Sequence, residues 1–151
     1  MTTLKAQLES DLRDAMKARD ELLTSTLRMA IAAVRTAEVA GKQARELSDD
    51  EVISVLTKEA KKRREAADAF GQAGRTEQAA AEQAEGRVLE DYLPAQLTGD
   101  ELAELVTATI AEVGATEPRE MGQVMKVLKP QVAGRADGGR VAAEVKRRLA
   151  P

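Results

Sequence analysis

A basic stretch that contains glycine, between Arg119 and Arg140, holds the residues best suited to bind a ligand. Guanidinium and ammonium groups attract phosphates, and a glycine-rich turn at a helix N-terminus binds anions through free N–H groups. It does not match a nucleotide-binding loop, since the Gly-Lys-Ser/Thr sequence is absent. The basic side chains of this stretch, Arg119, Lys126, Lys129, Arg135 and Arg140, are candidates to contact an anionic ligand.

The chain lacks the side chains that perform most enzyme chemistry. It contains no histidine and no cysteine. Ser-His-Asp and Cys-His catalysis are therefore excluded, together with disulfides and cysteine-based metal sites. Carboxylate, lysine, tyrosine and hydroxyl chemistry remains available, but no nucleophile with an adjacent base is recognisable. We predict no catalytic residue, no metal site, no cofactor and no intrinsic enzymatic activity.

Composition and helix-start signals predict an all-α fold. Phe70 and Tyr92 are the only aromatic residues, so the core must be aliphatic, which is typical of helix-on-helix packing. Two segments, 48–51 and 98–101, match the capping box that begins a helix. The first box contains three acidic residues, which we interpret as complementing the helix dipole rather than as a metal cluster.

The pattern divides the chain into an N-terminal helical domain, residues 1–97, and a C-terminal tail domain, residues 98–151. We expect a bundle of about four helices in the first domain, beginning near Thr3, Asp20, Ser48 and Thr76. We expect three short helices in the tail, the last of them capped by Asp137. The junction at 94–97 is too short to act as a flexible linker.

The middle helix of the tail is expected to be amphipathic. At 100° per residue, one face collects the apolar residues Met121, Val124, Met125 and Leu128. Pro130 predicts the end of this helix, with Val132 extending the apolar stripe if the chain bends little. Gly122 costs about 1 kcal/mol relative to alanine inside a helix. It therefore indicates either close packing by another backbone or the approach of an external ligand.

Charge is unevenly distributed along the sequence. Residues 119–151 contain eight basic and three acidic residues, a net charge of +5, whereas residues 1–118 carry −8. With two aromatic residues there is little on which to stack single-stranded bases, so structured RNA is the better candidate ligand. A second basic run, 58–64, is interrupted by Glu59, and we interpret it as a solvated helix face or as an anion-binding patch.

The sequence gives no sign of export or membrane insertion. The first residues alternate charged and apolar side chains, unlike a signal peptide, and no run approaches the roughly 18 apolar residues of a spanning helix. We therefore expect a cytoplasmic protein that makes no membrane contact.

Several short strings resemble the GatB/YqeY family. In the tail they are Ile110–Ala115, Met121–Lys126 and Gly134–Gly138. In the N-terminal part Leu27–Met29, Lys58–Glu59 and Glu90–Pro94 resemble the stand-alone YqeY-like proteins, so the resemblance covers nearly the whole chain. The same tail ends the B subunit of the glutamine-dependent amidotransferase that converts mischarged Glu-tRNA or Asp-tRNA.

The resemblance implies a helical domain followed by a tail that engages tRNA, with Lys126, Arg135, Arg140 and Gly122 as the matching contact positions. Arg119 and Lys129 follow from charge and helix face. The leading hypothesis is a non-catalytic, tRNA-associated protein. The alternative is a helical interaction module that binds an amidotransferase or synthetase subunit. The third is carbon–nitrogen ligase activity with glutamine as amido-N-donor, which the family name implies and no residue supports.

Overall fold

The computed structural model describes residues 2–150, and within that range the chain forms helices and no strand. The all-α prediction is confirmed. The helices are α1 (Leu4–Ala18), α2 (Glu21–Glu38), α3 (Asp49–Gln72), α4 (Thr76–Glu90), α5 (Gly99–Val113), α6 (Met121–Val132) and α7 (Gly138–Leu149), with one turn of 3₁₀ helix (Pro118–Glu120) before α6.

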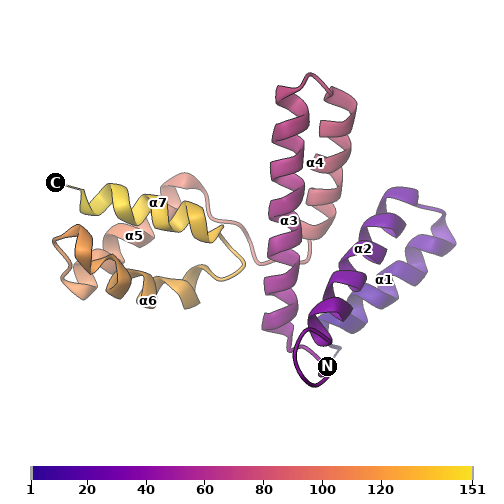
Figure 1. Ribbon diagram of the computed structural model, residues 1–151, viewed down its shortest axis with the longest axis horizontal. Coiled ribbons are helices and arrows are strands. Elements are labelled where there is room, and N and C mark those ends of the chain that lie inside the picture. Colours follow the sequence, from indigo (N-terminus) through magenta and orange to yellow (C-terminus); the bar gives the residue numbers. More distant parts are fainter. Residues whose placement is uncertain (1, 151) are drawn as a thin grey trace. The chain divides into compact units, whose positions relative to one another are not determined.

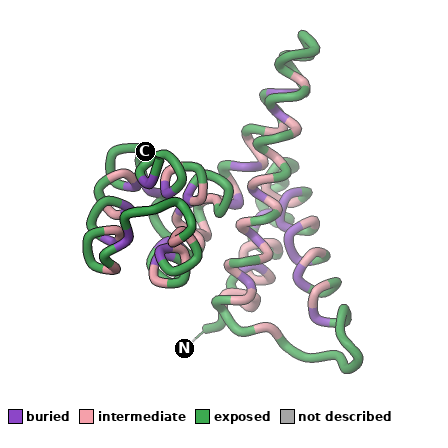
Figure 2. The backbone as a smooth tube through the Cα atoms, turned by 60° about the vertical axis from the view of Figure 1, so that its left-hand side comes forward, coloured by how far each residue is buried: buried purple, intermediate pink, exposed green. Residues whose placement is uncertain are grey.

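The chain divides into two compact units between Leu93 and Pro94. The first unit contains α1 to α4, and the second contains α5 to α7. Leu97, which the sequence-based boundary assigned to the first domain, is buried in the core of the second unit. In both units buried residues recur at intervals along the helices (Figure 2).

The first unit consists of two helical hairpins. Helices α1 and α2 lie side by side, and α3 and α4 form a longer pair (Figure 1). Aliphatic side chains from all four helices make one core, as the shortage of aromatic residues predicts. Its buried members are Leu8, Leu27, Ala30, Ile31, Val34, Val52, Leu56, Ala60 and Leu89.

Three of the four helices in the first unit start at a side-chain cap, and α4 starts without one. The Thr3 hydroxyl accepts a hydrogen bond from the Ala6 N–H, and the Asp20 carboxylate accepts one from Leu23. At the start of α3 the Ser48 hydroxyl accepts from the Glu51 N–H while the Glu51 side chain accepts from the Ser48 N–H. The capping boxes at Ser48 and Thr98 are both confirmed.

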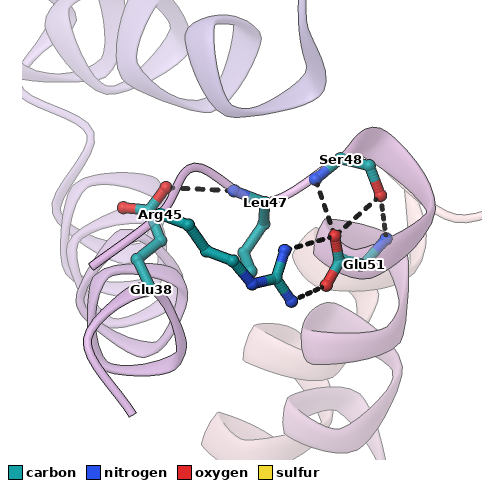
Figure 3. A network of polar contacts seen from close by, with 5 residues as sticks. All are labelled: Glu38, Arg45, Leu47, Ser48 and Glu51. Carbon is teal, nitrogen blue, oxygen red and sulfur yellow. Dashed lines mark hydrogen bonds and ion pairs between the residues drawn. The ribbon is translucent and has the colours of Figure 1, made fainter. Parts of the chain in front are cut away.

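The loop before α3 is fixed by a polar network (Figure 3). The Arg45 guanidinium donates two hydrogen bonds to the Glu51 carboxylate, and the Leu47 N–H donates to Glu38, at the end of α2. The hydrogen bonds from Arg45 and Ser48 lower the pKa of Glu51 to about 2. The acidic first turn of α3 is thus engaged in local structure, as the helix-dipole interpretation expects.

The second unit has its own aliphatic core, in which α5, α6 and α7 each contribute one face. Its buried members are Leu97, Leu102, Val106, Ala115, Val124, Leu128, Val132, Ala136, Val141, Val145 and Leu149. The prediction that Pro130 ends the middle helix is wrong, because α6 continues to Val132. Pro130 is exposed and Val132 is 5% exposed, so burial of the last turn offsets the missing proline N–H.

Candidate nucleic-acid interface

Helix α6 holds its basic side chains outward because its opposite face is buried. Val124 and Leu128 are fully buried, and Val132 continues the same row. Lys126 lies about 160° around the helix from both Val124 and Leu128, and Lys129 lies about 140° from Val124 and about 100° from Leu128. Both lysines are exposed. Two ammonium groups therefore stand on the solvent side of a helix fixed by its core contacts.

Lys126 and Lys129 also lack counter-charges. Among the described residues, neither side chain has a hydrogen bond or an ion pair. Arg119, one turn before α6, is 83% exposed and pairs with the neighbouring Glu117. The two lysines are therefore available to an anionic ligand, while Arg119 would have to share its charge with Glu117.

Gly122 lies on the exposed surface of α6, and close packing does not explain it. A Cβ atom built at this position meets no atom within 4 Å. The expectation that another backbone packs there is wrong within the described chain. The remaining expectation, that an external ligand approaches the backbone at this point, stays a prediction.

Arg135 and Arg140 hold the entry segment of the second unit. The Arg135 Nε donates to the carbonyl oxygen of Ala95 at 3.1 Å, and its own carbonyl oxygen accepts from the Leu97 N–H at 2.8 Å. The Arg140 Nη2 donates to the Leu97 carbonyl oxygen at 3.0 Å. Both arginines were predicted as RNA contacts, and the structure gives each of them an internal partner.

The sequence offered no signal for that role. The Arg135 side chain bonds to a carbonyl group 40 residues away in the sequence, and the Arg140 side chain to one 43 residues away. The Gln96 side chain adds a bond to the Gly134 carbonyl oxygen at 2.7 Å. Gly134 adopts a positive φ of 73°, which turns the chain toward this segment and which a side chain would disfavour.

The glycine-rich turn before α7 already has an anion at the helix start. The Asp137 carboxylate accepts a hydrogen bond from the Gly139 N–H at 3.2 Å, which confirms Asp137 as the N-cap. A phosphate approaching the same N–H groups would be repelled by this carboxylate. The turn is therefore a weaker phosphate site than its glycine content suggests.

Charges of opposite sign are segregated in the second unit. It contains eight basic and eight acidic residues, so its net charge is zero. Helix α5 carries four acidic residues and no basic one, whereas α6 and α7 together carry six basic residues and one acidic. The basic residues therefore act locally, on one part of a unit that is neutral as a whole.

Helix α7 adds one cation that the site prediction did not name. Glu144 pairs with Arg147 and Arg148, and the hydrogen bonds from these two guanidinium groups lower the pKa of Glu144. Lys146 is exposed and has no such partner in the described chain. Lys146 was counted in the +5 charge of residues 119–151, but the sequence alone does not show that Arg147 and Arg148 are paired whereas Lys146 is not.

The basic run on α3 is matched by carboxylates. Arg63 lies 3.3 Å from Glu82 and 3.5 Å from Glu85 of α4, and 3.7 Å from Glu59 of its own helix. Arg64 pairs with Glu90, and Lys62 with Glu59. The interpretation of this run as an anion-binding patch loses its support, because most of its charge is neutralised within the first unit.

The groups left for acid–base chemistry do not form a reactive centre. The Tyr92 hydroxyl donates to the Asp11 carboxylate, and burial together with Asp11 raises the pKa of Tyr92. A tyrosine held protonated in this way is a poor base. Over residues 2–150 there is no cluster of three or more acidic side chains able to hold a metal ion.

Within the same residues, no helix is both long enough and apolar enough to cross a membrane.

Two comparisons place the chain among known proteins. Residues 5–149 match the model of a family described as Yqey-like protein. An uncharacterized protein of Schizosaccharomyces pombe is 33% identical to the chain over 92 residues, which cover 60% of the chain and 72% of that protein. The family match spans both structural units.

Proposed function

Because the chain belongs to the YqeY-like family, we propose that it is a non-catalytic, tRNA-associated protein whose second unit contacts the phosphate backbone. The observation that carries the proposal is the outward face of α6, where Lys126 and Lys129 are exposed and without counter-charges. The resemblance of the tail to that of the amidotransferase B subunit supports tRNA as the ligand. A cytoplasmic location is part of the same proposal.

The geometry favours phosphate contacts over base readout. Two lysines on one helix supply point charges, and Gly122 leaves room for a backbone or ribose to approach. The second unit contains neither of the two aromatic residues, so it cannot stack single-stranded bases. A folded RNA recognised by shape and phosphate position fits this surface. We assign binding and no reaction to it.

The proposal is tested by titrating labelled, folded tRNA with the full chain by fluorescence anisotropy. We expect affinity to fall as salt rises from about 50 to about 200 mM, with a slope near −0.9 per phosphate contacted. The double variant Lys126→Glu, Lys129→Glu should weaken binding at least about tenfold, roughly 1.4 kcal/mol. Absent binding, or binding that does not depend on salt, would contradict the proposal.

Lys126 and Lys129 are better test positions than the arginines. Replacing Arg135 or Arg140 would also release the 95–97 segment, so a loss of binding would be ambiguous. The matched control is Lys58→Glu, Arg87→Glu, which makes the same change in net charge at two exposed positions of the first unit. We expect the control to bind tRNA within about twofold of the wild type.

A further inference from the structure

A groove of about 600 Å³ lies between α1 and α2 in the first unit, whereas the residues assigned above to RNA belong to the second unit. Its apolar lining, which we call the floor, is formed by Leu12, Met16, Ile31 and Ala32. Met16 is 49% exposed, one of three large apolar side chains with such exposure among the described residues. Covering an apolar strip of this kind with another apolar surface lowers the free energy.

Arginines stand along both sides of this floor. Arg13 comes from α1, and Arg28 and Arg35 come from α2. Arg13 has no ion pair in the described chain, and the one contact of the Arg28 guanidinium is with the Met16 sulfur at 3.8 Å. Arg35 approaches Glu9 at 3.9 Å, at the limit of an ion pair, and its side chain is 67% exposed. The groove thus has three cations and one anion.

This local excess contrasts with the first unit as a whole, in which 18 acidic residues outnumber 15 basic ones. The adjoining hollow beyond Met16 is balanced in charge, because Asp20 and Glu21 line it together with Arg19 and Arg28. The cations of the groove have a defined spacing. Arg28 and Arg35 are seven residues apart, two turns of α2, or about 10.5 Å along the helix axis.

We propose that this groove binds an acidic amphipathic helix of a partner protein. An apolar stripe on the ligand covers Leu12, Met16 and Ile31, and carboxylates two turns apart on the ligand face Arg28 and Arg35. The groove between two packed helices is a common seat for a third helix. RNA fits less well, because phosphates and riboses gain nothing from an aliphatic and thioether floor.

The inference does not depend on the proposed tRNA contact, because the two surfaces lie in different units and are tested with different variants. The probe is a synthetic, fluorescein-labelled helical peptide with leucines at i, i+4, i+7 and i+11, flanked on each side by glutamates seven residues apart. A second peptide carries lysine in place of each glutamate. A third has the acidic composition in scrambled order, so that charge alone is controlled.

We expect the acidic peptide to bind the full chain and to shift backbone amide resonances of α1 and α2 in a ¹⁵N–¹H spectrum. The variant Arg13→Glu, Arg28→Glu should weaken binding at least tenfold, and Met16→Ala should weaken it about threefold. These three residues are exposed, so the fold should be retained. The control Lys58→Glu, Arg87→Glu should bind as the wild type does.

Three results would overturn the inference. The first is equal binding of the lysine or scrambled peptide, which would show that neither the charge nor its spacing is recognised. The second is absent binding of the acidic peptide, or resonance shifts confined to residues outside α1 and α2. The third is displacement of the acidic peptide by tRNA with loss of tRNA affinity in Arg13→Glu, Arg28→Glu, which would make the groove an RNA site.

Discussion

On α3, basic side chains between residues 58 and 64 face carboxylates of α3 and α4, whereas on α6 Lys126 and Lys129 face solvent alone. The α3 run is the denser of the two along the sequence. In the folded chain the sparser pair has more charge available to a ligand. Two regions with similar residue types therefore differ in the charge that they leave unpaired, because their neighbours differ.

The comparison shows what makes a cation available. Arg63 exchanges water for three glutamates, and its side chain is only 23% exposed. It stabilises the contact between α3 and α4 and is poorly placed to bind anything else. Lys126 stays hydrated in the fold and has no ion pair, so an anion can bind it without displacing a carboxylate. A count of basic residues along the sequence shows neither the exposure of each cation nor its ion pairs.

The largest effect should come from removing Arg63. Arg63→Ala leaves Glu59, Glu82 and Glu85 facing one another at a partly buried site, and we expect a loss of about 1–3 kcal/mol in the free energy of unfolding. Urea unfolding followed by tyrosine fluorescence measures the first unit alone, since Tyr92 is the only tyrosine and tryptophan is absent. Lys126→Ala, the matched change on α6, lies in the second unit and is followed by circular dichroism of the whole chain, where its stability should stay within about 0.5 kcal/mol of the wild type. Equal stability of the two variants would break the comparison.

The two capping boxes, one in each unit, should show a smaller effect. Ser48→Ala and Thr98→Ala each remove a side-chain cap, and each should destabilise its unit by about 1 kcal/mol. Ser48→Ala is measured by tyrosine fluorescence and Thr98→Ala by circular dichroism of the whole chain. A loss below the error of both methods would mean that the caps form but do not stabilise.

Acid should act on the same network in the first unit. The pKa of Glu51 is about 2 in the fold and 4.5 ordinarily, so folding favours the ionised form. Its contribution is complete above about pH 4.5 and is lost as the pH falls toward 2. Glu51→Gln should therefore flatten the decline in stability of the first unit between about pH 5 and pH 3, as followed by tyrosine fluorescence. An unchanged decline would assign the acid sensitivity to other carboxylates.

The paired state of the α3 run can itself be tested by removing its partners. Glu82→Gln, Glu85→Gln and Glu90→Gln together leave Arg63 and Arg64 without their α4 carboxylates. We expect affinity for heparin or tRNA at low salt to rise about threefold through the first unit. The neutral change Gln83→Ala on α4 is the control. If the triple variant binds no more tightly than the wild type, the α4 carboxylates are not what keeps Arg63 and Arg64 from binding anions.

The smallest effect is expected at Gly122. Because a Cβ meets open space there, Gly122→Ala should raise the stability of the second unit by about 0.5 kcal/mol. If a ligand approaches the backbone at this point, the same change should lower tRNA affinity while Gln123→Ala leaves it unchanged. Higher stability with unaltered binding would remove Gly122 from the interface and leave Lys126 and Lys129 as its core.

The sequence by itself determined the local features of this protein. It predicted the helices, the caps at Asp20, Ser48, Thr98 and Asp137, and the buried face of α6, because each depends on residues within about two turns of one another. It also indicated the family, whose residue spacings extend along nearly the whole chain.

Only the tertiary structure decided which charges are free. The carboxylates that neutralise Arg63 lie 19 and 22 residues away, and the carbonyls that engage Arg135 and Arg140 lie 40 and 43 residues away. No periodicity links such positions, since they meet through the packing of whole helices. For the same reason α6 passes through Pro130, where burial of Val132 outweighs a local stop signal.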